Sequence, residues 1–367
     1  MKKILLFIII VCILSVLGLL MFNRNDGEVK KHEKMIKVEN KETVKEKKMS
    51  LVAVGDCLIH GALYMDAKTG SDTYDFSDMV SDIEPLIKDY DLKYFNQESI
   101  IGGKNLGVSH YPRFNSPDEI GDAMLNVGFN MVSLANNHSL DMGEEGILYS
   151  TEYWKNKNII MSGTNLNVED RDDIKVYEQN GIKFGYIAYT TVTNGLSTPQ
   201  NKEYLLNVYD KDKVKEDVNK IKDKVDVIIV SMHWGDEYTH VPVQEEKDIA
   251  EYLSSLGVNL IIGTHPHVIQ PVEYVNDTLV VYSLGNFISG QKPLGLDKII
   301  GLMVGMDIVV KDKVVFENIN YQLLYTYSNS SDRNYKVIPF SNLDDDVLPD
   351  YKSIENKYLD IVKGSNE

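Results

Sequence analysis

Beyond residue 48, short apolar runs alternate with segments whose apolar residues recur with a helical period. Apolar runs of this length predict buried strands, and the periodic segments predict amphipathic helices. Strands are expected within 50–61, 91–99, 129–138, 159–165, 225–238 and 258–267, and helices within 116–128, 143–158, 211–224 and 243–257. This alternation indicates an α/β sheet core.

Several turn and cap signals refine this prediction. Asn180-Gly181 and Asn276-Asp277 lie between apolar runs and predict two hairpins. The first strand is expected to break at Gly55-Asp56, and Ser116 is expected to cap the helix that follows it. Residues 49–290 are taken as the main domain, and 291–367 as antiparallel strands that complete it and end in a polar tail.

The first 48 residues have a different character. Residues 4–22 contain no charged side chain, and about 20 apolar residues suffice for a helix to cross a bilayer. We expect 1–22 to be an uncleaved transmembrane anchor, since no small-residue cleavage site follows it. A cleaved signal is the alternative. Residues 23–48 are charged and lack periodicity, which predicts a flexible tether. Lysines on both sides of the span leave its orientation open.

Charge limits the possible partners. The chain has a formal net charge of −17. Because the tether and the extreme N-terminus are net basic, the main domain is more acidic still. A domain of this charge is not expected to bind nucleic acid. The two cysteines, Cys12 in the span and Cys57 in the first strand, are not expected to form a disulfide.

Unusual polar residues follow the predicted strands where each strand ends. Ligands of open α/β sheets gather outside the carboxyl ends of the strands, so these side chains can converge. Pro266 lies between two of the histidines and fixes their relative directions. The residues are Asp56, Asn96, Glu98, Asn136, Asn137, His138, His233, His265 and His267.

This mixture of carboxylate, amide and imidazole groups is suited to Mn²⁺, Fe or Zn²⁺. One carboxylate can bridge two ions, as in two-metal hydrolases. Taken singly, each residue has an ordinary structural explanation, such as a turn for Asp56 or a surface position for Glu98. Taken singly, Trp234 and Tyr238 are expected to pack rather than bind, and Cys57 is expected to be a small buried residue. The joint pattern favours a metal site.

The motifs that carry these residues resemble the CapA (PgsA-type) poly-γ-glutamate capsule-synthesis family. This family is a branch of the calcineurin-like metallophosphoesterase superfamily. The resemblance extends over about residues 50–290. It rests on VGD (54–56), FNQE (95–98), SLANNHSLDMG (133–143), HWGDEY (233–238), GTHPHVIQ (263–270) and YSLGNF (282–287).

The resemblance implies a four-layer α/β/β/α sandwich of two facing sheets and a two-metal site. By analogy, Asp56 and His267 would bind one ion, Asn137, His233 and His265 the other, and Glu98 would bridge them. His138 would face the substrate as acid or charge stabiliser, oriented by Asp141. The candidate substrate contacts are Asn96, Asn136, Trp234 and Glu237.

Two features depart from the usual metallophosphoesterase pattern. Leu58 stands where a histidine is expected two positions after Asp56, and the nearest histidine is His60. This leaves the ion that Asp56 and His267 would bind short of a ligand. The expected Phe-Arg order is reversed at Arg113-Phe114, which puts an arginine contact to substrate in doubt.

For function, the resemblance implies a membrane-anchored protein of poly-γ-glutamate synthesis or export, with its main domain outside the cell and other membrane capsule-synthesis subunits as partners. A metal-dependent hydrolase acting on a phosphate ester or a γ-glutamyl amide is one interpretation. A non-catalytic, polymer-handling subunit of a synthase complex is the second. A cell-envelope phosphoesterase unrelated to capsule is the third.

Overall fold

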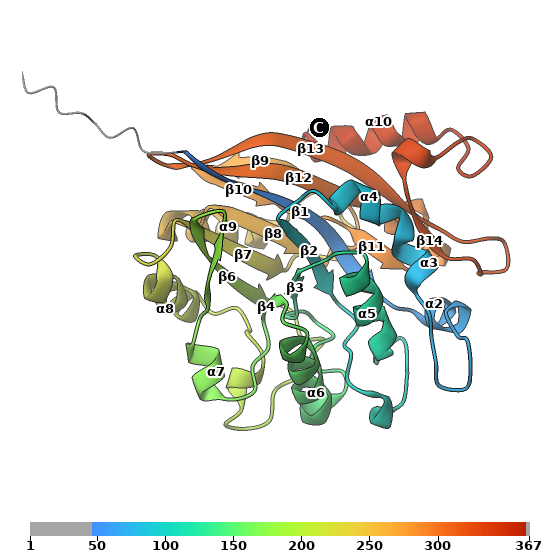
Figure 1. Cartoon of the computed structure of the whole chain (residues 1–367), viewed down its shortest axis with the longest axis horizontal. Helices are drawn as coiled ribbons and strands as arrows, with labels where there is room; N and C mark the ends of the chain where they lie inside the picture. Colours follow the sequence, from blue (N-terminus) through green and yellow to red (C-terminus); the bar gives the residue numbers. More distant parts are fainter. Residues whose placement is uncertain (1–45, 365–367) are drawn as a thin grey trace, which may run out of the picture. The chain divides into compact units, whose positions relative to one another are not determined.

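A computed structural model describes residues 46–364 (Figure 1). The predicted transmembrane anchor and nearly all of the predicted tether lie outside the described residues. Within 46–364, no helix combines the length and the apolar character needed to cross a membrane. The described chain forms two β-sheets with helices packed against them.

The first sheet has eight strands, and the first strand of the chain lies at its centre. Its order is β14-β13-β12-β1-β2-β3-β4, and β11 also pairs with β1. β1 is parallel to β2 and β11 but antiparallel to β12. The strands are β1 (Lys47–Leu58), β2 (Leu92–Gln97), β3 (Met131–Ser133), β4 (Ile160–Ser162), β11 (Asn286–Ser289), β12 (Ile300–Val310), β13 (Val314–Tyr327) and β14 (Lys336–Pro339).

The second sheet has six strands in the order β5-β6-β7-β8-β10-β9. Its centre is parallel, and the outer pairs β5/β6 and β9/β10 are hairpins. Asn180 and Gly181 both have positive φ, 52° and 77°, as the predicted tight turn requires. The strands are β5 (Val176–Gln179), β6 (Ile182–Thr190), β7 (Val227–His233), β8 (Leu260–Thr264), β9 (Val272–Val275) and β10 (Thr278–Val281).

Three apolar clusters hold these layers together. One lies between the sheets and joins Leu51 of β1 to Ile229 of β7. A second packs α5 and α6 against the first sheet, and a third packs α8 and α9 against the second. The helices are α2 (Gly61–Asp66), α3 (Ser77–Val80), α4 (Glu84–Ile87), α5 (Asp118–Asn126), α6 (Gly143–Asn156), α7 (Val168–Asp172), α8 (Lys211–Ile221), α9 (Gln244–Leu256) and α10 (Tyr351–Val362). The α/β prediction is confirmed.

β1 does not break at Gly55-Asp56, as the sequence indicated, but continues to Leu58. Its register shifts there because the strand exchanges β12 for β11 as its neighbour. The Asp56 N–H donates to the Gly285 carbonyl at 3.0 Å. A Cβ on Gly55 would lie 1.8 Å from that oxygen, so only glycine fits.

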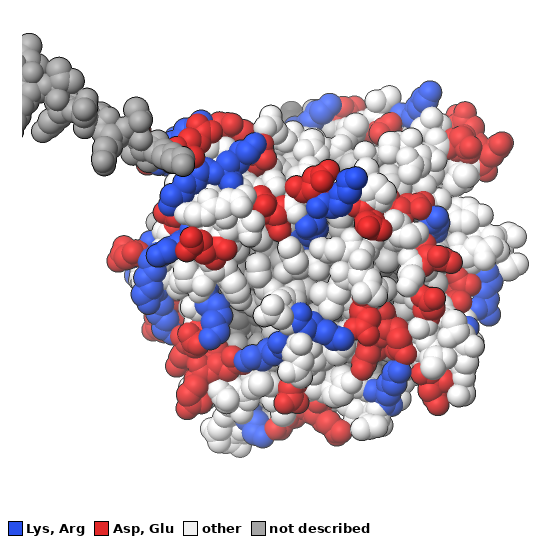
Figure 2. All heavy atoms as spheres, in the orientation of Figure 1, with Lys and Arg blue, Asp and Glu red and all other residues white. Residues whose placement is uncertain are grey.

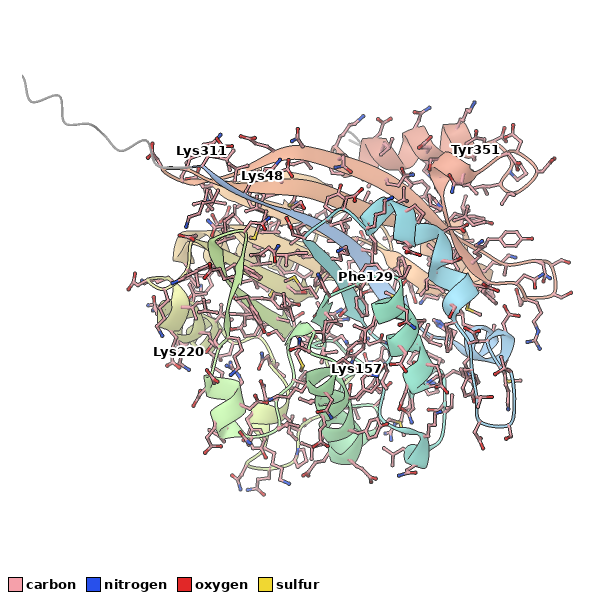
Figure 3. All side chains as sticks on the ribbon, viewed as in Figure 1. Lys48, Phe129, Lys157, Lys220, Lys311 and Tyr351 are labelled. Carbon is pink, nitrogen blue, oxygen red and sulfur yellow. The ribbon has the colours of Figure 1, made fainter. Side chains whose placement is uncertain are left out.

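Three further predictions are corrected. β1 begins at Lys47, two residues inside the predicted tether, and Lys48 lies with Lys311 at the edge where the described chain begins (Figure 3). Ser116 does not cap α5, since its hydroxyl donates to Ser99 Oγ at 2.8 Å and the helix begins at Asp118. Where a polar tail was expected, Tyr351–Val362 form α10, because Tyr358 and Ile361 pack into the core between the sheets.

Charged side chains of both signs are scattered over the face of the described chain that Figure 2 shows. Figure 2 shows acidic side chains spread over the face in view, with lysines and arginines interspersed among them. No broad basic patch is visible on this face.

Candidate metal centre

The polar residues at the strand ends are buried together. Asp56 lies in β1, Glu98 follows β2, His233 ends β7, and His265 and His267 follow β8. Each of these five side chains is at most 4% exposed. Parallel strands bring their carboxyl ends to the same edge, which is why residues far apart in sequence meet here.

Glu98 occupies the shared corner of two clusters that could each hold a metal ion. The first comprises Glu98, His233 and His265, and the second comprises Asp56, Glu98 and His267. Oε1 of Glu98 lies 3.7 Å from Nε2 of His233 and 3.6 Å from Nε2 of His267. Neither carboxylate oxygen of Glu98 has a hydrogen-bond partner among the described residues.

Three ligand-type atoms meet in the first cluster. Nε2 of His233 lies 3.0 Å from Oδ1 of Asn137 and 3.1 Å from Nδ1 of His265. The other ring nitrogen of His233 lies 3.0 Å from Oγ1 of Thr264. The hydroxyl therefore fixes the ring orientation and leaves Nε2 facing the cluster.

The second cluster is built around Asp56. Nδ2 of Asn96 donates to Oδ1 of Asp56 at 2.7 Å, and the N–H of His265 donates to Oδ2 at 3.3 Å. Nδ1 of His267 lies 3.0 Å from Oδ1 of Asn286, so Nε2 is again the nitrogen left to face Glu98. Asn286 lies in one of the quoted motifs, but sequence reasoning assigned it no role.

The turn that carries the two histidines is conformationally unusual. His265 and His267 both have positive φ, 100° and 59°, on either side of Pro266. Such angles are uncommon for residues other than glycine and cluster at functional sites. The turn can pack tightly because Gly263 precedes it, where a Cβ would lie 1.9 Å from the Tyr282 carbonyl oxygen.

Burial and mutual repulsion control the charges of these groups. Burial, reinforced by neighbouring imidazoles, lowers the pKa of His233 and lowers that of His265 to about 3. Burial also raises the pKa of Glu98 well above its ordinary range. Burial opposes charging of His267, but Glu98 and Asp56 outweigh it and raise its pKa to about 9. His233 and His265 are therefore held in the neutral form that binds metals.

His138 and Asp141 form a pair beside the clusters. Nδ1 of His138 lies 2.7 Å from Oδ2 of Asp141, and the same oxygen accepts the Phe114 N–H at 2.7 Å. The Phe114 ring meets the imidazole edge-on at 4.6 Å. Oδ1 of Asn136 accepts the His138 N–H at 3.0 Å. Asp141 thus orients both the histidine and the neighbouring loop.

A cavity of about 760 Å³ opens over this region, and its wall includes Asn137, His138, Asp141 and His267. This volume is within the range of small-molecule sites, roughly 300–1,000 Å³. Two other hollows in the described chain contain none of the strand-end residues. The chemistry of the clusters decides in favour of the 760 Å³ cavity as the functional one.

The four candidate substrate contacts separate into two groups. Glu237 is exposed and lines the cavity. Trp234 does not, because it is fully buried and its indole N–H donates to the Tyr282 carbonyl at 2.9 Å. Asn96 and Asn136 are also buried and hold Asp56 and His138 in place. Among the four candidates, only Glu237 thus lines the cavity, and the other three are engaged inside the protein.

The residues present fit divalent metal ions. A buried carboxylate without hydrogen bonds is costly unless a cation pairs with it, and both oxygens of Glu98 are in that position. Oδ1 of Asn96 is a further buried oxygen without a partner among the described residues. The neutral imidazoles of His233 and His265 complete the first cluster. Leu58 leaves the second cluster with three ligands, and His60 does not join it, since its Nδ1 lies 3.1 Å from the Leu58 carbonyl.

Two metal-type clusters that share one carboxylate, at the strand ends of a two-sheet α/β fold, are an arrangement typical of two-metal hydrolases. The chain belongs to the family described as bacterial capsule synthesis protein PGA_cap, which it matches over residues 50–291. The resemblance inferred from the motifs is thereby confirmed.

Two capsule proteins are similar in sequence. The chain is 29% identical to the PGA biosynthesis protein CapA of Bacillus subtilis (strain 168) over 167 residues, which is 45% of this chain and 44% of that protein. It is 28% identical to the capsule biosynthesis protein CapA of Bacillus anthracis over 183 residues, 48% of this chain and 44% of that protein. The match thus covers less than half of each relative.

Similarity to solved structures is more distant. The calcineurin-like phosphoesterase YfkN of Bacillus subtilis has a TM-score of 0.44 at 17% identity, with 86% of this chain and 99% of that chain covered. A 5'-nucleotidase precursor of Thermus thermophilus has a TM-score of 0.45 at 13% identity, with 85% and 58% covered. Both scores lie below 0.5, so function must be argued from the family and the site.

Proposed function

We propose that this protein carries out a metal-dependent step of poly-γ-glutamate capsule synthesis or export at the cell membrane. Its site would act on a phosphate ester or on the γ-glutamyl amide of the polymer. The family supports the capsule role, since both curated relatives are named for capsule or PGA biosynthesis. The two buried clusters support the metal-dependent chemistry.

Glu98 is the observation that carries the chemical part of the proposal. A carboxylate that is fully buried, lies between two histidines and bonds to no other described group is a poor structural element. It is a good bridging ligand, because two cations would neutralise it and replace the hydrogen bonds it lacks. In a purely structural role its burial would be offset only by His267, 3.6 Å away and without a hydrogen bond.

The roles of the chain's own groups follow from their contacts. Asp56 and His267 would hold one ion, Asn137, His233 and His265 the other, and Glu98 both. Bound metal would polarise the scissile group and supply hydroxide near neutral pH.

His138 would donate a proton to the leaving group. Its Nδ1 is bonded to Asp141, which leaves Nε2 as the ring nitrogen able to meet a substrate in the cavity.

A second function is favoured by one observation. The Asp56 cluster offers three ligands, with Leu58 where a fourth is expected, so its ion would be weakly held. A protein that uses its cavity to hold or guide the polymer, as a non-catalytic subunit of a membrane complex, would tolerate such a site. A third function, that of an envelope phosphoesterase unrelated to capsule, differs from the other two in its substrate, a phosphate ester.

One experiment separates these functions. The full-length chain, purified in detergent, is analysed for metals and then assayed against phosphate monoesters, phosphodiesters and γ-glutamyl oligomers. Two ions per chain with hydrolysis of γ-glutamyl substrates supports the proposed activity. Hydrolysis of phosphate esters alone supports the envelope phosphoesterase. Absence of metal would overturn the metal-dependent mechanism.

The membrane location is a proposal that rests on residues 1–22. We expect the apolar segment to remain on the mature protein and to hold residues 46–364 outside the cell. Intact mass of membrane-extracted protein tests retention, and a chain that starts after residue 22 would show a cleaved signal. Protease treatment of intact cells tests the side of the membrane, because only an external domain is degraded.

A further inference from the structure

One arginine is placed at the cavity over the candidate metal centre. Arg113 is exposed and is the only lysine or arginine among the described residues that line the 760 Å³ cavity. Arg113 forms no ion pair with any described residue. A solvent-facing guanidinium without a protein partner, on the wall of a cavity in an acidic domain, is suited to a ligand anion.

The loop that carries Arg113 is fixed at both ends. Ser109 and Asn115 exchange two backbone hydrogen bonds, of 3.0 and 3.1 Å, and Ser109 Oγ donates to the Arg113 carbonyl at 2.8 Å. The next residue, Phe114, donates its N–H to Asp141. The backbone of Arg113 is therefore tied to the His138–Asp141 pair, and only its side chain is free to meet a ligand.

The loop that carries Glu237, on the wall of the same cavity, is also fixed by a backbone hydrogen bond. It is exposed, and the next residue, Tyr238, donates its N–H to the Pro266 carbonyl at 2.8 Å. That carbonyl lies between the two histidines of the metal clusters. Glu237 thus extends from a loop anchored on one side of the site, as Arg113 extends from a loop anchored on the His138–Asp141 pair.

The other ionisable groups of the cavity wall are already engaged or neutral. His138 and Asp141 are bonded to each other, and Asp141 also accepts the Phe114 N–H. His267 faces Glu98 and Asp56 within the metal clusters. Burial lowers the pKa of His60 to about 4, so its ring is uncharged at neutral pH. The wall therefore offers a ligand one positive charge, Arg113, and one negative charge, Glu237, neither of which has an ion-pair partner among the described residues.

The mouth of the cavity is apolar. Tyr111, Tyr238 and Leu294 line it and are 69%, 40% and 55% exposed, which is unusual for large apolar side chains. Aromatic rings at such a rim can pack on flat amide groups and methylene chains. A ligand that combines an amide-linked aliphatic backbone with one carboxylate and one ammonium would match both the rim and the wall.

We propose that Arg113 binds the α-carboxylate, and Glu237 the α-ammonium, of the amino-terminal unit of a γ-linked glutamyl chain. This inference rests on the proposed function and names the part of the polymer that enters the site. In a γ-linked chain every unit keeps its α-carboxylate, but only the amino-terminal unit also has a free α-amine. An interior unit would satisfy Arg113 and place a further carboxylate near Glu237, where repulsion disfavours it.

Calorimetric titration of the full-length protein in detergent tests the inference without requiring turnover. The probes are a γ-linked triglutamate with a free amine, its N-acetylated form, an α-linked triglutamate and inorganic phosphate. The free γ-linked peptide should bind at least about tenfold more tightly than its acetylated form, as expected for loss of one charge-assisted contact. Arg113→Gln should weaken both γ-linked peptides at least about tenfold, with partial recovery in Arg113→Lys.

Glu237→Gln gives the sharper result. It should weaken the free-amine peptide to the level of the acetylated one and leave the acetylated peptide unchanged or bound more tightly. Arg333→Gln is the matched control, since Arg333 is also exposed but does not line the cavity. Equal affinity of free and acetylated peptides, or tight binding in Arg113→Gln, would overturn the assignment.

Phosphate binding that depends on Arg113, in a protein that ignores the γ-linked peptide, would also overturn it. Metal content, measured on the same samples, judges the proposed metal-dependent mechanism separately. Neither Arg113 nor Glu237 belongs to a metal cluster, so the titrations judge this inference in either case.

Discussion

The carboxylate of Glu98 faces the imidazole of His267 in the protein interior, with Oε1 3.6 Å from Nε2. Both side chains are at most 2% exposed. This distance is longer than a good hydrogen bond, and His233 approaches the same oxygen at 3.7 Å. The geometry leaves room for ions between the groups, and the first prediction follows from it.

Glu98→Gln should remove most of the bound metal, because the amide has no charge to share between two cations. Elemental analysis should show a fall to less than one ion per chain. After chelation the variant should unfold at the same or a lower temperature than the parent, because His267 loses its buried carboxylate partner. The exposed Glu152 provides the control variant Glu152→Gln. Two retained ions in Glu98→Gln would exclude a bridging carboxylate.

His265→Ala and His267→Ala should lose different ions. His265 belongs to the cluster with His233, whereas His267 belongs to the cluster with Asp56. Titration of Mn²⁺ or Zn²⁺ into each metal-free variant should therefore reveal one residual site, with unequal affinity in the two variants. The His265→Ala variant should retain the weaker site, because the Asp56 cluster is short of a ligand. Two metal sites in each variant would contradict the assignment of His265 and His267 to different ions.

Asp141→Ala should loosen the loop that carries Arg113. The substitution deprives both His138 and the Phe114 N–H of their acceptor, and each buried group left unpaired costs about 1–3 kcal/mol. Unfolding in urea should show a loss of roughly 2–4 kcal/mol. Hydrogen exchange at the Phe114 amide should accelerate, while bound metal stays constant. Asp141→Asn keeps one acceptor oxygen, so its stability and its Phe114 exchange rate should lie between those of the parent and of Asp141→Ala. An unchanged exchange rate in Asp141→Ala would contradict the role of Asp141 in holding this loop.

Glu246→Gln should change how stability depends on pH. Glu246 is fully buried, its Oε2 accepts the Val243 N–H at 2.6 Å, and burial raises its pKa to about 7. The folded state therefore binds this proton more tightly than the unfolded state, so the parent loses stability as pH rises from about 5 through 7. Glutamine cannot ionise, and at pH 8 the variant should be more stable by about 1–3 kcal/mol.

Unfolding free energies at pH 5 and pH 8 measure this difference. The neighbouring exposed residue supplies the control, because Glu245→Gln should leave the pH dependence unchanged. A Glu246→Gln protein whose stability falls between pH 5 and pH 8 as steeply as the parent's would refute the prediction.

Strand ends were the most informative feature of the sequence. An apolar run that stops at a polar residue marks both the strand and the edge to which it delivers that residue. This is why the meeting of Asp56, Glu98, His233, His265 and His267 could be anticipated. The same reasoning cannot tell which polar residues at that edge face the ligand. Asn96 and Asn136 have the same residue type and position as Asn137, yet Nδ2 of Asn96 donates to Asp56 and Nδ2 of Asn136 donates to the Gln97 carbonyl inside the protein.

Residues that act through contacts between distant loops left no signal in the local pattern. Thr264 and Asn286 orient the histidines, but a threonine or an asparagine beside a strand is ordinary. The change of partner along β1 was also invisible, because the pairing of Asp56 with β11 depends on the close approach of Gly55 to Gly285. These features depend on tertiary contacts, which join Thr264 to His233 across 31 residues, Asn286 to His267 across 19, and Gly55 to Gly285 across a far longer stretch of chain.

The central position of β1 sets an order of events during synthesis. Its partner β2 follows soon afterwards, but β12, which closes the other edge of residues 47–53, begins only at Ile300. At a synthesis rate of about 5–20 residues per second, this edge of β1 stays unpaired for on the order of tens of seconds before β12 is made. A fragment cut to the family match, residues 50–291, would never receive it. The exposed edge would invite strand pairing between molecules, so soluble expression requires the chain to continue through β14.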